Sequence, residues 1–300
     1  MAKKNEEVST VRRAKHGGIL TVIFAILSFL WIAPILIVFL NSFKRKAFIF
    51  THPFSLSCYS ITEGWDKFKA GITRAFCGWL NYSNGIRKTN LWECFGTSLF
   101  ITIGSVALII LCCSMCAWYI TRVHTKVTKT IYVLCLFSII VPFQMVMFTL
   151  SKFANILHLS NPLGIIIVYL GFGAGLAVFM FTGFVKGISL EIEEAAMIDG
   201  CSPLQTFFKV VFPILKPTTV TVAILEAMWV WNDYLLPYLV LSSKYRTIPI
   251  AVQYLKQSHG QIDWGAMMAV LVLAILPIII FYIACQKYII EGVLAGAVKG

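Results

Sequence analysis

The chain has 300 residues, of which 59% are hydrophobic and only 13% are charged, and its mean hydropathy is +0.83. A soluble domain is about half apolar and about a quarter charged, so this composition excludes an ordinary soluble protein and predicts a multi-pass membrane protein. The formal net charge is +12. In a membrane protein such an excess of lysine and arginine sets orientation and contacts anionic headgroups, and it does not indicate nucleic-acid binding.

The chain begins with a polar, basic segment, and residues 1–18 are expected to form a cytoplasmic tail. Residues 19–40 are apolar throughout and long enough to cross about 30 Å of hydrocarbon. No small-residue cleavage site follows this run, so the sequence predicts a retained membrane anchor. Pro34 lies inside it, where neighbouring helices can satisfy the backbone.

Residues 41–90 form a polar loop that is expected on the external side. Apolar residues recur in it at steps of three and four, which predicts an amphipathic helix. These residues are Trp65, Phe68, Ile72, Ala75 and Trp79. Two interpretations remain open: a helix that lies on the membrane surface, or a contact for an external partner.

Nine cysteines are scattered along the chain, many of them inside apolar runs. Cys113 and Cys116 form a C-x-x-C pair, which is expected to supply small buried hydrophobes rather than redox or metal chemistry. Cys58, Cys77 and Cys94 lie in or beside the external loop, and their odd number and spacing select no disulfide pair.

Five further apolar segments predict membrane spans, at residues 91–120, 131–151, 162–185, 218–241 and 265–286. The expected fold is therefore an all-α membrane protein of about six transmembrane helices. The transmembrane domain is expected over residues 19–290, with a cytoplasmic tail at 291–300. Gly171 and Gly175, with Gly173 between them, give the spacing of a close helix contact.

The second half of the chain has one long polar-rich interruption, within residues 186–217. It has the pattern of two short helices joined by a turn. Ser189 is the expected cap of the first helix and Gly200 the residue after its end. Ser202 is the expected cap of a second helix that starts at Pro203. Pro213 and Pro217 are expected to end it.

Four groups of residues in this segment resemble the EAA loop of ABC-importer permeases. They are Glu194-Ala195-Ala196, Asp199-Gly200, Phe212-Pro213 and Lys216-Pro217. In that family the loop is cytoplasmic and docks on the ATPase subunit. The resemblance implies that the coupling residues are Glu193, Glu194, Ala195, Ala196, Asp199, Gly200 and Pro213. The alternative is an ordinary acidic loop between two spans.

Other motifs resemble the carbohydrate branch of these permeases, the maltose and multiple-sugar type. They are Asn41-Ser42-Phe43-Lys44, Trp231-Asn232-Asp233-Tyr234-Leu235-Leu236-Pro237, Asp263-Trp264-Gly265, Gln286-Lys287-Tyr288 and residues 292–300. The resemblance covers nearly the whole chain and implies the type I ABC-importer permease architecture. Two departures are Gly187-Ile188-Ser189-Leu190, where the family often has an Ile-Pro step, and a longer segment at 70–90.

The resemblance also implies a role and partners. The chain would be the permease subunit of an ATP-driven, binding-protein-dependent sugar importer that works by alternating access. Its partners would be a homologous sister permease, two ATPase subunits and an extracytoplasmic sugar-binding protein. It would be a multi-pass protein of the cell membrane with both termini cytoplasmic, without catalytic residues, metal or bound cofactor, and ATP would be used by the ATPase subunits.

The expected orientation conflicts with one charge pattern, because the external loop 41–90 contains eight lysines and arginines. Such an excess normally marks the cytoplasmic side. The orientation nevertheless follows from the resemblance, since an ATPase-docking loop has to face ATP.

Glu226 is the most informative charge, because it lies deep inside the predicted span 218–241. A carboxylate at membrane depth is expected to face a cavity or a partner. On a continuous helix Glu226, Trp229, Asp233 and Pro237 share one face. A carboxylate and an aromatic ring suit a sugar, since the acid accepts hydrogen bonds from hydroxyls and the ring covers C–H groups.

These residues are therefore candidates for the substrate pathway, and Gln144 beside Pro142 is a weaker one. A structural Glu226, protonated or bonded to the sister subunit, is the alternative. An ion-coupled secondary transporter of a small solute would use Glu226 as its coupling acid. A membrane-embedded enzyme would need a nucleophile–base pair or a metal motif, which the dispersed histidines do not provide.

Overall fold

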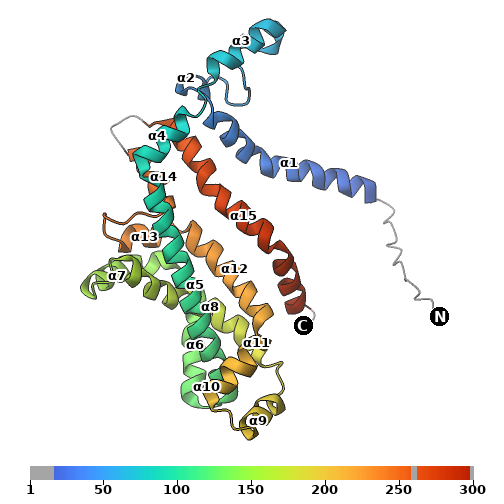
Figure 1. Ribbon diagram of the computed structural model, residues 1–300, viewed down its shortest axis with the longest axis vertical. Helices are drawn as coiled ribbons and strands as arrows, with labels where there is room; N and C mark the ends of the chain where they lie inside the picture. Colours follow the sequence, from blue (N-terminus) through green and yellow to red (C-terminus); the bar gives the residue numbers. More distant parts are fainter. Residues whose placement is uncertain (1–16, 258–261, 298–300) are drawn as a thin grey trace, which may run out of the picture.

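The structure, a computed structural model, describes residues 17–257 and 262–297, so most of the expected N-terminal tail and residues 298–300 lie outside it. The described chain is helical, and its extended residues pair only in an isolated bridge between Lys44 and Phe76. Figure 1 shows long helices between two groups of short ones. The predicted all-α class is confirmed.

The long helices and their continuations are α1 (Gly17–Ser42), α5 (Leu91–Arg122), α6 (Lys126–Ile140), α7 (Phe143–Ile156), α8 (Pro162–Val185), α12 (Lys216–Asn232), α13 (Leu235–Val240) and α15 (Trp264–Ala297). One group of short elements comprises α2 (Lys46–Ile49), η1 (Ile61–Glu63), α3 (Trp65–Ala75), α4 (Leu80–Thr89) and α14 (Ile248–Gln257). The other, at the opposite end, comprises α9 (Leu190–Ile198), α10 (Pro203–Thr206), η2 (Phe207–Val211) and α11 (Phe212–Ile214). Among the described residues four helices are long and apolar enough to cross a membrane, and two bent helix pairs raise the number to six.

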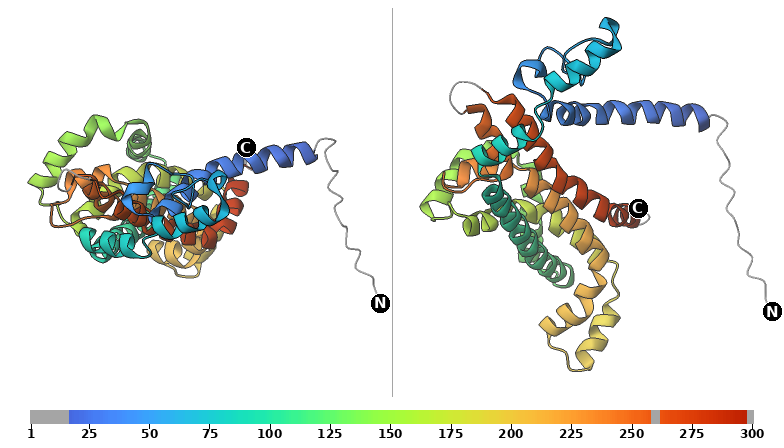
Figure 2. Two further views of the ribbon diagram at one scale, coloured as in Figure 1. Left: turned by 90° about the horizontal axis from the view of Figure 1, so that it is seen from above. Right: turned by 45° about the horizontal axis from the view of Figure 1, so that its top comes forward.

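The first helix, α1, leaves most of its apolar side chains exposed. None of its span-length window is buried, and Trp31 is 77% exposed. Its buried residues are Asn41 and Ser42, at its C-terminal end. Figures 1 and 2 show α1 leaving the bundle from that end, with its other end far from the remaining helices. Such a surface is suited to lipid or to another membrane-embedded subunit.

The predicted span 131–151 is wrong as a single helix, because the chain turns by 109° between α6 and α7. Pro142 explains the break. A proline in a helix lacks the N–H and clashes with the carbonyl four residues earlier, and it drives the preceding residue out of the α region. Val141 accordingly has extended dihedral angles, with φ −75° and ψ 115°.

The predicted span 218–241 is also interrupted, since α12 ends at Asn232 and α13 begins at Leu235. Asp233 Oδ1 accepts hydrogen bonds from the amides of Leu235 and Leu236, at 3.0 and 3.4 Å. An aspartate that binds nearby amides competes with helix continuation. Pro237 adds to this effect, because its ring would clash with the Asp233 carbonyl in a continuous helix.

Helices α5 and α8 pack along each other at the centre of the bundle, and small residues allow the contacts of α8. A Cβ added at Gly173 would lie 2.6 Å from Ile109 Cδ1 of α5. One added at Gly175 would lie 2.8 Å from the Cys135 carbonyl oxygen of α6. Gly171 faces open space. The close approaches therefore use Gly173 and Gly175 rather than the predicted Gly171–Gly175 pair.

Buried polar groups fix the C-terminal end of α1. We call this group the polar knot: Asn41, Ser42, Lys44, Asn81 and Tyr82. Lys44 Nζ donates to Asn41 Oδ1 and to the His52 carbonyl, at 3.1 and 2.8 Å. Asn81 Nδ2 donates to the carbonyls of Ser42 and Lys44, and the Ser42 and Tyr82 hydroxyls are 2.7 Å apart. Burial lowers the pKa of the Lys44 ammonium group. The knot ties α1 to α4.

An ion pair between Lys88 and Asp263 joins α4 to the start of α15. Burial alone would raise the pKa of Asp263. The hydrogen bonds from Lys88 and from the Ala266 amide, together with the positive charges of Lys88 and Lys46, lower the pKa by a larger amount. The resulting pKa of Asp263 is below its ordinary value. The pair therefore stabilises the contact between α4 and the start of α15 when the carboxylate is ionised.

The predicted amphipathic helix in the external loop is present as α3, although Trp79 lies beyond it, just before α4. In Figures 1 and 2, α3 extends away from the bundle beyond α2 and α4. All nine cysteines are free thiols, so Cys58, Cys77 and Cys94 form no disulfide.

Candidate functional site

The first helix of the interruption, α9, has the ends that its sequence predicts. Ser189 Oγ accepts a hydrogen bond from the Glu191 amide. Two acidic residues in the first turn complement the positive end of the helix dipole. At the other end Gly200 has φ +86°, and its amide and the Cys201 amide donate back to the carbonyls of Met197 and Ala196. This pair of bonds satisfies carbonyls that a helix end leaves open.

The second helix begins where Ser202 and Pro203 predict. Ser202 and Gln205 form a reciprocal capping box. The helix continues through the π-helical turn η2 into α11, which contains Pro213. It ends at Leu215, and the chain bends there by 77° into α12. We call residues 186–217 the coupling loop, after the role that the resemblance implies for them.

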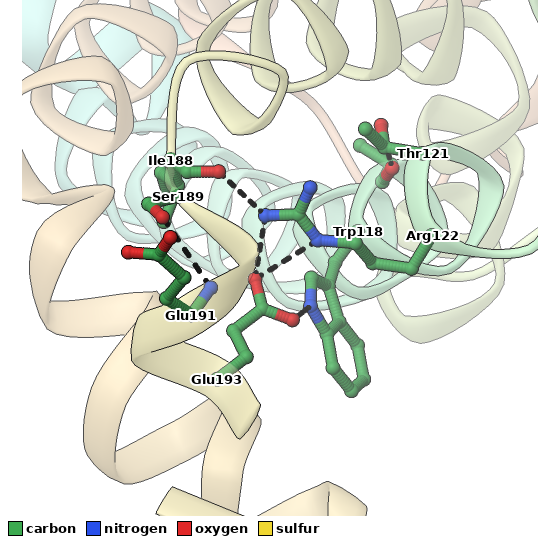
Figure 3. Close-up of polar contacts among 8 residues, drawn as sticks. Trp118, Thr121, Arg122, Ile188, Ser189, Glu191 and Glu193 are labelled. Atoms are coloured by element: carbon green, nitrogen blue, oxygen red, sulfur yellow. Dashed lines mark hydrogen bonds and ion pairs between the residues drawn. The ribbon is translucent and has the colours of Figure 1, made fainter. Parts of the chain in front are cut away.

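A buried ion pair anchors the coupling loop to the end of α5 (Figure 3). Glu193 is 1% exposed and accepts hydrogen bonds from Arg122 Nε at 3.0 Å and Arg122 Nη2 at 2.7 Å. Its other carboxylate oxygen accepts from Trp118 Nε1 at 2.8 Å, and Arg122 Nη2 also donates to the Ile188 carbonyl. We call Glu193, Arg122 and Trp118 the latch. A buried carboxylate needs such full pairing because its desolvation is costly.

Apolar contacts reinforce the latch from the second helix. Phe207 is fully buried, and its ring centroid is 5.4 Å from that of Trp118. Val211 and Leu215 are buried in the same cluster, which also contains residues of α5, α8 and α12. The inner faces of both short helices are therefore part of the bundle core, so the loop is held rigidly against the spans.

The outer face of the coupling loop combines apolar and acidic side chains. Ile198 is 86% exposed, Leu204 57% and Phe208 45%. Glu194, Ala195, Asp199, Gly200 and Pro213 are exposed as well. Of the predicted coupling residues, Glu193 and Ala196 are instead buried. Two residues that look equivalent in the sequence, Glu193 and Glu194, thus have different roles: the first is an internal anchor and the second faces outward.

Glu226 is buried between helices, not exposed to an open path. It is 2% exposed, and its Oε2 has no hydrogen-bond partner among the described residues. A Cβ added at Gly173 of α8 would lie 2.9 Å from this oxygen. The carboxyl group therefore packs against the α8 backbone, at the place where the missing side chain of Gly173 leaves room.

Trp229 and Asp233 are connected through Tyr169 of α8. Trp229 is 40% exposed, and its ring is perpendicular to that of Tyr169 at a centroid distance of 5.4 Å. The Tyr169 hydroxyl donates to Asp233 Oδ2 at 3.0 Å. Because α12 ends at Asn232, the predicted common helical face of Glu226, Trp229 and Asp233 is wrong beyond that residue. Gln144 is exposed on α7, after the bend at Pro142.

Sequence reasoning missed Arg122 and Trp118 as parts of this site. They are four residues apart on α5, which places them on one helical face. An arginine and a tryptophan on one face at the end of a span would have been a signal. Their partner, however, is 71 residues from Arg122 in the chain, and no local pattern gives that pairing.

Comparison with known proteins identifies the family. Residues 109–294 match the family described as "Binding-protein-dependent transport system inner membrane component". The chain belongs to this family. The matched region starts within α5 and includes the latch, the coupling loop and most of α15. The chain is therefore a permease subunit of a binding-protein-dependent importer and a multi-pass membrane protein, not an enzyme.

Three curated relatives support this membership. The chain is 37% identical to "Probable starch degradation products transport system permease protein AmyC" of Thermoanaerobacterium thermosulfurigenes, over 94% of this permease and 96% of the relative. It is 32% identical to "Multiple sugar-binding transport system permease protein MsmG" of Streptococcus mutans, over 94% of each chain. It is 30% identical to "Melibiose/raffinose/stachyose import permease protein MelC" of Bacillus subtilis, over 96% of this permease and 99% of the relative.

A solved structure has the same fold. It is a chain of a bacterial ABC transporter involved in the import of the acidic polysaccharide alginate, and it matches with a TM-score of 0.70 at 21% identity. The match covers 96% of this permease and 99% of that chain. The helices of this permease are therefore arranged as in that transporter chain.

Proposed function

We propose that this permease forms half of the translocation pathway of an ATP-driven importer for an oligosaccharide or a related sugar. The named substrates of the three relatives support the sugar, since they are starch degradation products, multiple sugars, and melibiose, raffinose or stachyose. Transport occurs by alternating access, and the coupling loop transmits the movement of the ATPase to the spans.

The two faces of the coupling loop carry this proposal. The inner face is fixed to α5 by the latch and by Phe207. The outer face exposes Ile198 and Leu204, which lie on short helices at the end of the bundle. Exposed apolar side chains in a polar loop indicate a docking surface. A movement of the ATPase that displaces this surface is passed to α5 through the latch.

The proposal includes the assembly that the family resemblance implies. A homologous sister permease forms the other half of the pathway, and two ATPase subunits dock on the coupling loops and use ATP. An extracytoplasmic binding protein delivers the sugar at the side of α3 and α4. This arrangement places both termini and the coupling loop in the cytoplasm. The unburied surface of α1 supports a membrane-embedded partner.

Substitution of Ile198 tests the coupling role. Ile198→Asp places a charge on the docking surface and is expected to abolish ATP-driven sugar uptake and co-purification of the ATPase. Ile198→Val keeps the surface apolar and is the matched control. Gly200→Asp is expected to abolish uptake while the chain remains in the membrane. Normal uptake by both aspartate variants would contradict the proposal.

The sugar path is tested separately with Glu226→Gln and Trp229→Ala. Trp229 has the exposure needed to cover a sugar ring, whereas Glu226 reaches a sugar only when α8 and α12 separate. Loss of uptake with intact complex assembly is the expected result for Trp229→Ala. Wild-type uptake by both variants would remove these residues from the pathway.

A further inference from the structure

A cavity of about 430 Å³ lies between the cytoplasmic ends of α5 and α8 and the start of α6. Its volume is in the range of small-molecule sites. Four basic side chains line it: His124 before α6, Lys126 and Lys129 in the first turns of α6, and Lys186 just after α8. The lining contains no carboxylate.

The lysines of this cavity have no ion pair. The ion pairs found in the described part of the chain join Lys88 to Asp263 and Arg122 to Glu193. Glu193, the buried carboxylate of the coupling loop, is already paired with Arg122. Three uncompensated ammonium groups around one concave site favour an anionic ligand.

A second observation points to a ligand at the same place. Thr182 of α8 lines the cavity and is only 2% exposed, yet its hydroxyl has no hydrogen-bond partner among the described residues. Buried hydroxyls are normally paired, and a threonine in a helix can bond to the carbonyl four residues earlier. The Thr182 hydroxyl does not, so it remains available as a donor to a bound group.

The lining differs between the helix ends and the helix interiors. The four basic residues lie at the helix ends, whereas Thr182 lies one turn deeper than Lys186 on α8. Ile120 lies in the last turn of α5, ahead of His124, and Tyr132 lies well inside α6. Basic side chains at the opening of the cavity and mixed polar and apolar side chains inside it suit a ligand with an anionic headgroup and an apolar part. A free phosphate ion would use only the opening.

We propose that this cavity binds the headgroup of an anionic phospholipid of the cytoplasmic leaflet. The phosphate lies among Lys126, Lys129 and Lys186, and the Thr182 hydroxyl donates to an oxygen of the glycerol ester region. Basic pockets between transmembrane helices on this side are suited to such headgroups. The leaflet rests on the proposed function, which places the coupling loop in the cytoplasm. Because Thr121 of the same cavity precedes Arg122, a bound lipid also braces the latch.

The test measures lipid retention without transport, so its outcome is independent of the proposed function. The full chain, with the subunits that co-purify, is reconstituted in phosphatidylcholine nanodiscs that contain phosphatidylglycerol. Retained phosphatidylglycerol is then counted by native mass spectrometry. The triple variant Lys126→Gln/Lys129→Gln/Lys186→Gln is expected to lose at least about tenfold in phosphatidylglycerol affinity. Thr182→Val, which keeps the side-chain shape, is expected to lose a few-fold.

The control variant Lys67→Gln/Lys69→Gln/Arg87→Gln removes three exposed external charges and is expected to retain the lipid. Equal retention by wild type and by the cavity variants, or equal loss in the control, would overturn the proposal. A parallel arm adds inorganic phosphate at about 10 mM to wild-type nanodiscs. Displacement of the lipid by phosphate would assign the site to the free ion instead.

Discussion

Removal of the Glu193 carboxylate should release the coupling loop from the bundle. Glu193→Ala deletes the acceptor of two hydrogen bonds from Arg122 and one from Trp118. Arg122 would keep the Ile188 carbonyl as a partner. Breaking a buried ion pair by deleting one partner costs about 3–5 kcal/mol. The Arg122 side chain is 18% exposed and regains water, so the lower end, about 3 kcal/mol, applies.

Hydrogen exchange of the α9 amides is the direct assay. A loss of about 3 kcal/mol in the free energy of local opening speeds exchange roughly 100-fold, since 1.4 kcal/mol is a factor of ten. Glu194→Ala is the matched control, because Glu194 is adjacent and exposed. It should change the opening free energy by less than about 0.5 kcal/mol.

A double variant separates the ion pair from general damage to the loop. Glu193→Met with Arg122→Met replaces both charges with apolar side chains and should recover much of the loss, because no unpaired charge stays buried. The reasoning would be refuted if the α9 amides of Glu193→Ala exchanged no faster than those of Glu194→Ala. In that case Phe207 and its apolar neighbours would hold the loop without the latch.

Three further predictions concern stability. Gly200→Ala should lower the free energy of unfolding by about 1–2 kcal/mol, because an L-residue is strained at φ +86°; equal thermal midpoints of wild type and variant would contradict this. Gly173→Ala should cost about 1–3 kcal/mol by overpacking, whereas Gly171→Ala, which faces open space, should be neutral, as thermal unfolding in detergent would show. The lowered pKa of Asp263 predicts that wild type has a higher free energy of unfolding than Asp263→Asn, by a constant amount above about pH 5. This difference should shrink as the pH falls through the pKa that Asp263 has in the folded state. A difference that persists in acid would exclude the ion pair with Lys88 as its source.

Local signals were sufficient where the structure depends on neighbouring residues in the chain. Ser189, Gly200 and the Ser202-Pro203 pair define the ends of the two short helices, since caps act within a few residues. Apolar run length likewise located the spans. Pro142 and Pro237 are helix breakers that the sequence already shows. The length of the apolar runs nevertheless led to the prediction of two continuous helices, and the structure interrupts both of them.

Tertiary contacts decided what the sequence could not. Glu193 and Glu194 are adjacent carboxylates, and only the position of α5 makes one an anchor and leaves the other exposed. The same holds for Glu226, whose surroundings depend on the absent side chain of Gly173 on another helix. A hydrophobic pattern gives the depth of a residue in the membrane, but it does not give the neighbour that the residue faces.

Because the buried contacts of α1 are confined to the polar knot at one end, the rest of this helix is a separable part of the chain. None of its span-length window is buried against its own chain, so that length contributes little to the fold of the other helices. Chimeras in which a foreign anchor helix is spliced on just before Asn41 should therefore keep the fold of the other helices. A junction a few residues later would remove the hydrogen bonds that Lys44 and Asn81 make in the polar knot. Helices α1 and α4 would then lose this connection.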